Sequence, residues 1–239
     1  MEEDRTIAIK EYEECYIAFL DILGFKALVK EKNCSYISEI MEKVNWGKVP
    51  IWAAGKNVEK GRVDIHVKII SDSICLYVDS SSEQNLQRLL FCCQSFQQDL
   101  LDCETPIFVR GGIAKGNIYA DGDVIFGPGL IEAYQMEEFN AKYPRVIITN
   151  SLLLTFRDPS SKNFIRNLED IAFRDFDGFY TLNYFRDLVC NRSNGVLIKK
   201  VKRYINSTLD VTIDNSLREK YNYVLNNILK EEQLANIIE

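Results

Sequence analysis

Two aspartates, Asp21 and Asp72, stand at points where the chain turns, and carboxylates in such places can bind divalent cations. Asp21 ends an apolar run that begins at Tyr16, and Gly24 follows it, a pattern that predicts a buried strand, a turn and a helix starting near Phe25. Asp72 lies in a Ser-Asp-Ser turn between two further apolar segments. If that hairpin pairs beside the first strand, both carboxylates reach the same edge of one sheet.

Two carboxylates at one edge, with the backbone carbonyl of Ile22, can hold two divalent cations beside a phosphate bound at the start of a helix. Such an arrangement suits in-line attack of a hydroxyl on a nucleotide phosphate. The alternative is structural: Asp21 caps the helix, and Asp21 and Asp72 are unrelated turn residues. The residues alone leave both interpretations open.

Composition excludes several classes of protein. The 239 residues carry a net charge of −6 and a single histidine, His66, which argues against nucleic-acid binding, Ser-His-Asp catalysis and multi-histidine zinc sites. The seven cysteines form no C-x-x-C pair, and we expect a reduced, cytoplasmic protein. The acidic start does not resemble a signal peptide, and no apolar run is long enough to span a membrane, so no membrane partner is expected.

Hydrophobic periodicity predicts alternating strands and helices followed by a helical tail. Capping boxes at Ser80-x-x-Glu83 and Ser216-x-x-Glu219 indicate two helix starts. The basic residues at 199–203 form one face of an amphipathic segment, either solvated or anion-binding. The expected elements are strand 16–21, helix 25–44 interrupted near 34–35, loop 45–61, strands 62–70 and 74–78, helix 83–101, strands 107–119 and 124–126, helix 130–140, strand 143–149, helix 150–157, irregular chain 158–175, strand 179–185, helix 198–205 and a C-terminal helix.

This order predicts a single α+β domain with helices on one face of the sheet. We expect residues 1–185 to form its catalytic part and residues 186–239 a helical extension of the same domain.

Four segments, in this order, resemble the motifs of class III nucleotidyl cyclases. Residues 19–25 (Phe-Leu-Asp-Ile-Leu-Gly-Phe) resemble the first metal motif, and residues 70–74 (Ile-Ser-Asp-Ser-Ile) the second. Residues 109–116 resemble the family's Arg-x-Gly-Ile-x-x-Gly strand, and residues 126–133 the segment before its third helix. The resemblance covers about 16–185. It implies a palm-like, ferredoxin-like βαββαβ sheet that works as a homodimer with its sites at the interface.

The resemblance also assigns roles to residues. Asp21 and Asp72 match the metal aspartates, Ile22 contributes its carbonyl, and two Mn²⁺ or Mg²⁺ ions are implied. The turn Leu23-Gly24-Phe25 matches the phosphate-binding backbone. Lys68 matches a base-contacting lysine, and the implied substrate is a nucleoside triphosphate.

Three positions depart from the purine cyclases. Val124 replaces a base-reading Asp, Ile131 a ribose-positioning Asn and Gln135 the transition-state Arg. Other cations can replace that arginine, although each is also compatible with a structural role. The candidates are Arg110, Lys115, Lys142 and Arg145.

The same motifs, with the Tyr-Pro-Arg segment at 143–145, are similar to the bacterial pyrimidine cyclases of the Pycsar anti-phage systems. That resemblance implies conversion of UTP or CTP into cyclic UMP or cyclic CMP, with UTP expected ahead of CTP, and a separate effector protein that reads the product. The alternative from another class is a non-catalytic nucleotide-binding signalling module, which the losses at Ile131 and Gln135 favour. A diguanylate cyclase or polymerase palm lacks support, because no Gly-Gly-Asp-Glu-Phe-like hairpin is present.

Overall fold

The computed structural model describes residues 11–45, 65–156, 171–191 and 194–238. Most of the loop expected at 45–61, and most of the irregular segment expected at 158–175, lie outside this part of the chain. The elements, in order, are β1 (Glu13–Ile22), α1 (Phe25–Glu31), α2 (Cys34–Asn45), β2 (His66–Ile70), β3 (Ser73–Asp79), α3 (Glu83–Leu101), β4 (Val109–Asp121), β5 (Val124–Phe126), α4 (Pro128–Asn140), β6 (Val146–Ile148), α5 (Asn150–Phe156), β7 (Ala172–Arg174), β8 (Tyr180–Leu182), α7 (Tyr184–Cys190), α8 (Gly195–Val211) and α9 (Asn215–Ile238).

One sheet organises the described chain, with the strand order β2-β3-β1-β4-β6-β8-β7 and β5 paired to β4. β1 runs antiparallel to both β3 and β4, and β2 runs antiparallel to β3. The order β4-β1-β3-β2 is that of a ferredoxin-like βαββαβ unit. The fold class expected from the sequence, an α+β chain built on such a sheet, is therefore confirmed.

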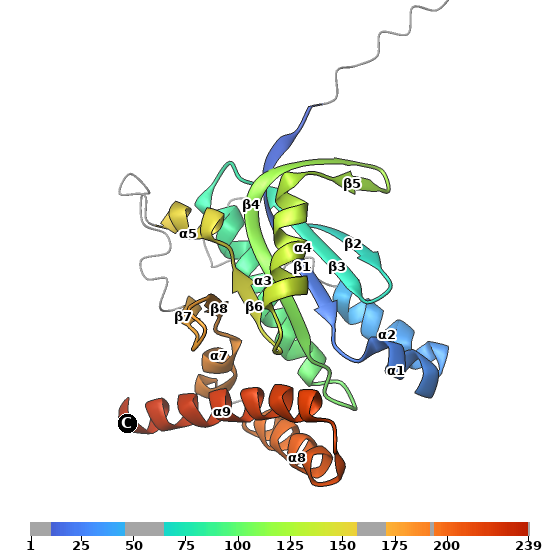
Figure 1. The fold of residues 1–239 in the computed structure, drawn as a ribbon, viewed down its shortest axis with the longest axis vertical. Helices are drawn as coiled ribbons and strands as arrows, with labels where there is room; N and C mark the ends of the chain where they lie inside the picture. Colours follow the sequence, from blue (N-terminus) through green and yellow to red (C-terminus); the bar gives the residue numbers. More distant parts are fainter. Residues whose placement is uncertain (1–10, 46–64, 157–170, 192–193, 239) are drawn as a thin grey trace, which may run out of the picture.

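The helices lie on both faces of the sheet, which corrects the expectation of a single covered face (Figure 1). On β1, Tyr16 and Leu20 pack into the apolar cluster formed with α2 and α3. The alternate residues Ile17 and Phe19 face the opposite way, and both pack into the cluster that contains Ala133 of α4. Because β1 is a central strand whose alternate residues are both apolar, each face needs its own cover.

Close contact between α4 and the sheet depends on a glycine. A Cβ atom on Gly112 of β4 would collide with the carbonyl oxygen of Ala133 and with the side chain of Met136. The missing side chain lets α4 lie directly on β4. This contact fixes which residues of α4 face Arg110, two positions before Gly112 on the same strand.

The C-terminal helices form a second apolar cluster with the end of α3 and the start of β4. Leu101 and Phe108 pack in it against residues of α7, α8 and α9. Figure 1 shows α8 and α9 below the sheet, with α7 between them and β8.

A buried ion network joins the sheet to α9. Arg145, which has no exposed side-chain surface, lies with Nη1 2.5 Å from Asp175 Oδ2 and pairs with Asp177 through Nη2. The hydroxyl of Tyr223 on α9 donates to Asp175 Oδ2 at 2.7 Å. The network therefore links three segments distant in the sequence.

Several element ends differ from the sequence-based expectation because other side chains cap the helices. Ser82, rather than Ser80, accepts the N–H of Asn85 at the start of α3. Asp214 accepts the N–H of Ser216 at the start of α9. The last predicted strand stops at Leu182, and β7 forms where irregular chain was expected.

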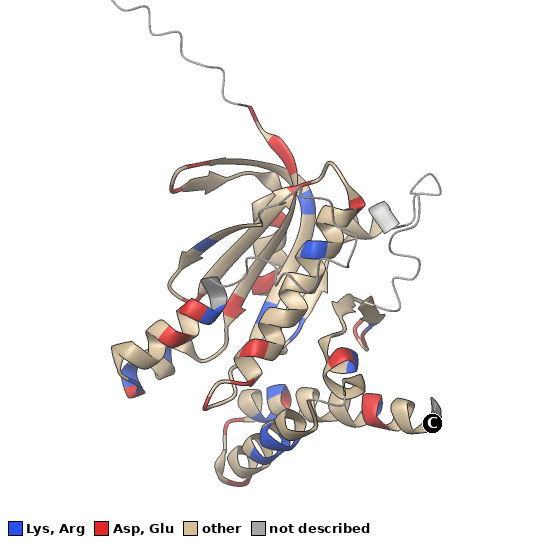
Figure 2. Ribbon diagram, turned by 180° about the vertical axis from the view of Figure 1, so that it is seen from behind, with Lys and Arg blue, Asp and Glu red and all other residues tan. Residues whose placement is uncertain are grey.

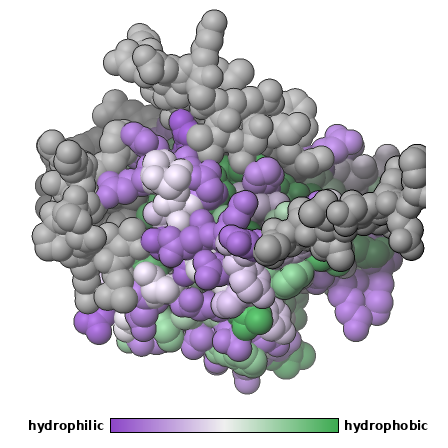
Figure 3. Space-filling model, turned by 90° about the horizontal axis from the view of Figure 1, so that it is seen from above, coloured by the Kyte–Doolittle hydropathy of each residue, from purple (hydrophilic) through white to green (hydrophobic). Residues whose placement is uncertain are grey.

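Charged residues are interspersed over the described elements, with several basic positions on α8 at the bottom of Figure 2. Two of these are paired: Lys200 Nζ donates to the carbonyl of Asp102 at 3.0 Å, and Lys202 contacts Glu232 at 2.5 Å. The described atoms of the face seen from above are mostly hydrophilic, with hydrophobic residues toward its lower and right margins (Figure 3). None of the helices in the described ranges is long and apolar enough to cross a membrane.

Candidate active site

The two aspartates singled out in the sequence come together at one edge of the sheet. Asp21 lies near the end of β1, opposite Ser73 of β3, and Asp72 occupies the two-residue turn between β2 and β3. The N–H of Ile22 donates to the carbonyl oxygen of Asp72 at 3.1 Å. Their proximity has an electrostatic consequence, because the charge of Asp72 raises the pKa of Asp21.

Burial and neighbouring charges act on the Asp21 carboxyl group. Burial raises its pKa above the ordinary value, the hydrogen bond and charge of Arg110 lower it, and the charges of Asp72 and Glu138 raise it again. The net direction is upward, since desolvation of the carboxylate is the largest of these causes. A positive charge at this edge would therefore stabilise the ionised form.

Arg110 of β4 and Glu137 of α4 complete the charged cluster. Arg110 Nε lies 3.0 Å from Asp21 Oδ2 and 2.8 Å from Glu137 Oε1. The sequence indicates Arg110 only as one of four candidate cations and gives no role to Glu137. The signal was present: Glu137 follows Ala133 by four residues and so lies on the buried stripe of α4, where an acid is unusual.

Burial has a large effect on Glu137. Its side chain is only 3% exposed, and desolvation raises the pKa of its carboxyl group to about 7 although Arg110 lowers it. The charges of Asp21, Glu138 and Asp72 add to the increase. The cluster thus contains two carboxylates, Asp21 and Glu137, on one guanidinium, and the charge of Asp72 raises the pKa of both.

The turn after β1 matches the expected phosphate-binding backbone only in part. Gly24 adopts φ 78°, the left-handed region that favours glycine, and serves as the N-cap of α1. The N–H of Leu23 donates to the carbonyl of Phe108 at 2.9 Å and so cannot point at a phosphate. The N–H groups of Phe25 and Lys26 have no intrahelical acceptor upstream, as at any helix start, whereas the N–H of Ala27 donates to the carbonyl of Gly24 at 3.0 Å.

Lys68 lies away from the two aspartates, at the hairpin formed by β4 and β5. Its Nζ donates to the carbonyl of Gly122, in the turn that leads to Val124. Lys68 and Val124 are the two positions that, by the resemblance, would contact the base of the nucleotide. The side chain of Lys68 therefore reaches the hairpin on which Val124 lies.

The other candidate cations have partners elsewhere. Lys115 pairs with Glu14 at 3.0 Å. Lys142 pairs with Glu219 at 2.9 Å. Arg145 is enclosed in the network described above. Of the four candidates, Arg110 is the one in contact with Asp21.

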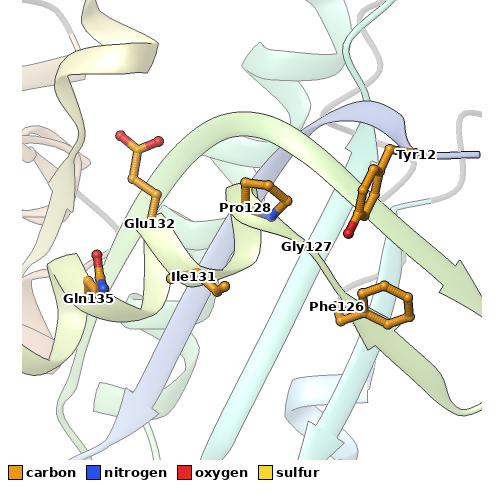
Figure 4. Close-up of a pocket in the computed structure, with 7 residues that line it drawn as sticks. All are labelled: Tyr12, Phe126, Gly127, Pro128, Ile131, Glu132 and Gln135. Atoms are coloured by element: carbon orange, nitrogen blue, oxygen red, sulfur yellow. The ribbon is translucent and has the colours of Figure 1, made fainter.

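A cavity of about 410 Å³ lies between β5, α4 and Tyr12, the residue before β1 (Figure 4). Two of the departing positions, Ile131 and Gln135, line it from α4. Tyr12 and Phe126 face one another across its far side, with ring centroids 6.1 Å apart. The complete lining consists of Tyr12, Phe126, Gly127, Pro128, Ile131, Glu132 and Gln135.

The donor atoms at the edge suit hard cations such as Mg²⁺ or Mn²⁺, which prefer carboxylate and carbonyl oxygens. Within the described ranges, no group of three or more His, Cys, Asp or Glu side chains is arranged to hold a metal ion. Mg²⁺ is commonly bound by one or two carboxylates together with substrate phosphates, so Asp21 and Asp72 fit that mode.

No family model and no curated protein sequence matches the chain. Solved structures that are similar to it include the catalytic core of a rhodopsin-guanylyl cyclase with converted specificity in complex with ATPαS, at 19% identity over 61% of this chain and 81% of that one, with a TM-score of 0.46. A bacterial light-regulated adenylyl cyclase matches at 15% identity over 81% and 99%, with a TM-score of 0.45. An adenylate/guanylate cyclase/hydrolase from Silicibacter pomeroyi matches at 20% identity over 64% and 85%, with a TM-score of 0.41. With every TM-score below 0.5, the site and its chemistry rest on the geometry of this chain.

Proposed function

We propose that this protein is a nucleotidyl cyclase that depends on divalent cations. The ribose 3′-oxygen of a nucleoside triphosphate would form the new bond to the α-phosphorus, and pyrophosphate would leave. The observation that carries the proposal is the meeting of Asp21 and Asp72 at one sheet edge, joined by the hydrogen bond from Ile22 to the Asp72 carbonyl. The alternative, two turn aspartates with structural roles, predicts the same backbone contacts but no binding of cations.

Asp21, Asp72 and the carbonyl of Ile22 would hold Mn²⁺ or Mg²⁺, two ions per site. Bound cations would supply charge neutralisation of the triphosphate and a lower pKa for the attacking hydroxyl. The turn at Gly24 and the first amides of α1 would bind phosphate oxygens. The N–H of Leu23 is not available to bind phosphate, because it donates to the carbonyl oxygen of Phe108.

The proposed substrate is UTP or CTP. Val124 and Ile131 offer no hydrogen-bonding side chain where purine cyclases, according to the resemblance, read the base and position the ribose. Lys68 remains as a polar group at the β4–β5 hairpin. A site from which purine-directed contacts are missing favours the smaller pyrimidine bases.

The resemblance to Pycsar cyclases extends the proposal to biology. The product, cyclic UMP or cyclic CMP, would act as a second messenger during phage infection and be read by a separate effector protein. The enzyme would be a homodimer with its sites at the interface. Exposed apolar side chains on β5 and α4 support this, Phe126 being 48% and Ile131 55% exposed.

A non-catalytic nucleotide-binding module is the second candidate. Ile131 and Gln135 favour it, because neither carries the positive charge of the arginine that stabilises the transition state in the purine cyclases. Arg110 favours catalysis, since it supplies a cation beside Asp21.

Incubation of the purified protein with each of the four nucleoside triphosphates and Mn²⁺ separates these candidates. We expect a cyclic pyrimidine nucleotide and pyrophosphate, detected by mass spectrometry. A cyclic purine product would refute the specificity. Saturable binding of a nucleotide without any turnover would favour the binding module.

A further inference from the structure

One guanidinium serves two carboxylates at the candidate site. Arg110 Nε lies within ion-pair distance of both Asp21 Oδ2, at 3.0 Å, and Glu137 Oε1, at 2.8 Å. Only the contact with Asp21 has hydrogen-bond geometry. Within the part of the chain that the structure describes, Glu137 Oε1 is buried and accepts no hydrogen bond.

Burial of Glu137 has no evident advantage for folding alone. A buried carboxylate without a hydrogen-bond partner is destabilising, and a small apolar residue would continue the stripe of Gly129 and Ala133 on α4. The group that Glu137 contacts is the guanidinium beside a candidate metal ligand. The acid at position 137 is therefore better explained by an effect on the position of Arg110 than by stabilisation of the fold.

Cation binding at Asp21 changes the position of Arg110. A divalent cation on Asp21 would lie within a few ångströms of the guanidinium, and like charges repel strongly in a partly buried site. Arg110 would have to release Asp21, and Glu137 Oε1 is the acceptor already in reach. A rotation that redirects the Nε–H is enough to make that hydrogen bond.

We propose that Glu137 is a positioning residue: when a divalent cation binds Asp21, the guanidinium of Arg110 leaves Asp21 and pairs with Glu137. In the metal-free protein Arg110 neutralises Asp21, and in the metal-bound protein it pairs with Glu137. The inference rests on the proposed function in one respect, the binding of cations by Asp21. Beyond that function, the inference adds an exchange of partners by Arg110, from Asp21 to Glu137, which sets the affinity of Asp21 for the cation.

Binding of Mn²⁺ alone, followed by electron paramagnetic resonance, tests this without any turnover. Glu137→Gln keeps the shape but weakens the acceptor, so Arg110 stays on Asp21 and Mn²⁺ affinity falls by about tenfold or more, the usual effect of losing a group that orients a metal ligand. Glu138→Gln is the matched control for loss of charge alone. Glu138 is the next residue and is exposed, and its charge also acts on Asp21 and Glu137, although other causes are larger. Its loss should change affinity by less than about threefold, because exposed charges are screened.

A double-mutant cycle tests whether Glu137 affects Mn²⁺ affinity through Arg110. Arg110→Met removes the competitor for Asp21 and should bind Mn²⁺ more tightly than the wild type. In that background Glu137→Gln should have no further effect, because the cation it positions is absent. Thermal melting of each variant checks folding, and the Arg110→Met result stands even if Glu137→Gln is unstable.

Three outcomes would overturn the inference. The first is wild-type affinity in Glu137→Gln, and the second is an equal loss in Glu137→Gln and Glu138→Gln. The third is a loss that persists in the Arg110→Met background, which would mean that Glu137 acts on the cation directly. A different result would show that the proposed metal site itself is wrong. In that case Asp21→Asn would bind Mn²⁺ as tightly as the wild type, and both the proposed function and this inference would be refuted.

Discussion

The N–H of Ile22 donates to the carbonyl oxygen of Asp72 at 3.1 Å, and this bond ties the end of β1 to the β2–β3 turn. Because Ile22 directly follows Asp21, the bond holds the two aspartates in a fixed relation. Asp72 is thus positioned by backbone contacts rather than by its own side chain. Replacing its carboxylate should therefore leave the hairpin intact.

The first prediction concerns that carboxylate. Asp72→Asn should reduce cyclase activity by at least about a hundredfold, because one of two cation-holding groups is lost, an effect comparable to removing a charge-stabilising contact. Product formation measured by mass spectrometry tests it. Asp210→Asn, an exposed position on α8, is the control and should retain activity. Wild-type turnover in Asp72→Asn would contradict the two-aspartate site.

The second prediction concerns pH. The pKa of Glu137 is raised from 4.5 to about 7, so between these values the folded protein holds a proton that the unfolded chain has released. The free energy of unfolding of the metal-free protein therefore falls as pH rises through this window, by roughly 3 kcal/mol from this group at about 1.4 kcal/mol per pKa unit. Asp21 contributes in the same direction, since its pKa is also raised.

Urea denaturation at a series of pH values measures this dependence. Glu137→Gln cannot release the proton, so its stability relative to the wild type should increase from pH 4.5 to pH 7. Glu138→Gln should keep most of the wild-type slope, because burial is the largest cause of the raised pKa of Glu137 and the charge of Glu138 is a smaller one. Parallel curves for the wild type and Glu137→Gln would show that burial does not perturb this carboxyl group.

The third prediction compares two basic residues. Arg145→Met leaves Asp175 and Asp177 without their buried partner and should lower the free energy of unfolding by about 3–5 kcal/mol. Lys142→Met breaks an exposed pair with Glu219 and an exposed contact with the ring of Tyr143, and should have little effect. Chemical denaturation of both variants makes the comparison. Equal effects would mean that the network does not join the sheet to α9 as its geometry indicates.

The fourth prediction concerns assembly. If the apolar side chains of β5 and α4 cover one another in a homodimer, the double variant Phe126→Glu/Ile131→Glu should sediment as a monomer at concentrations where the wild type is dimeric. Buried charges without partners oppose association strongly. Val211→Glu introduces a charge at an exposed apolar position on α8 and should not change the sedimentation coefficient. If the double variant is still dimeric, the interface does not include these side chains of β5 and α4.

The sequence by itself determined the order of the elements from β1 to α5 and placed the two aspartates at turns that follow or join strands. Alternating apolar residues in β1 and β3, and a two-residue turn at Asp72, are local signals, and local periodicity specifies strands and hairpins. The left-handed turn at Gly24 could be anticipated for the same reason.

Only the tertiary structure decided what surrounds Asp21. The contacts among Asp21, Arg110 and Glu137 join β1, β4 and α4, and no local pattern specifies how far a helix lies from a strand. That distance depends on Gly112, which lets α4 approach β4 and brings Glu137 over Arg110. The same packing covers the second face of the sheet. Long-range contacts of this kind arise from packing of complete elements, which is why the sequence indicated the aspartates but not their counter-ions.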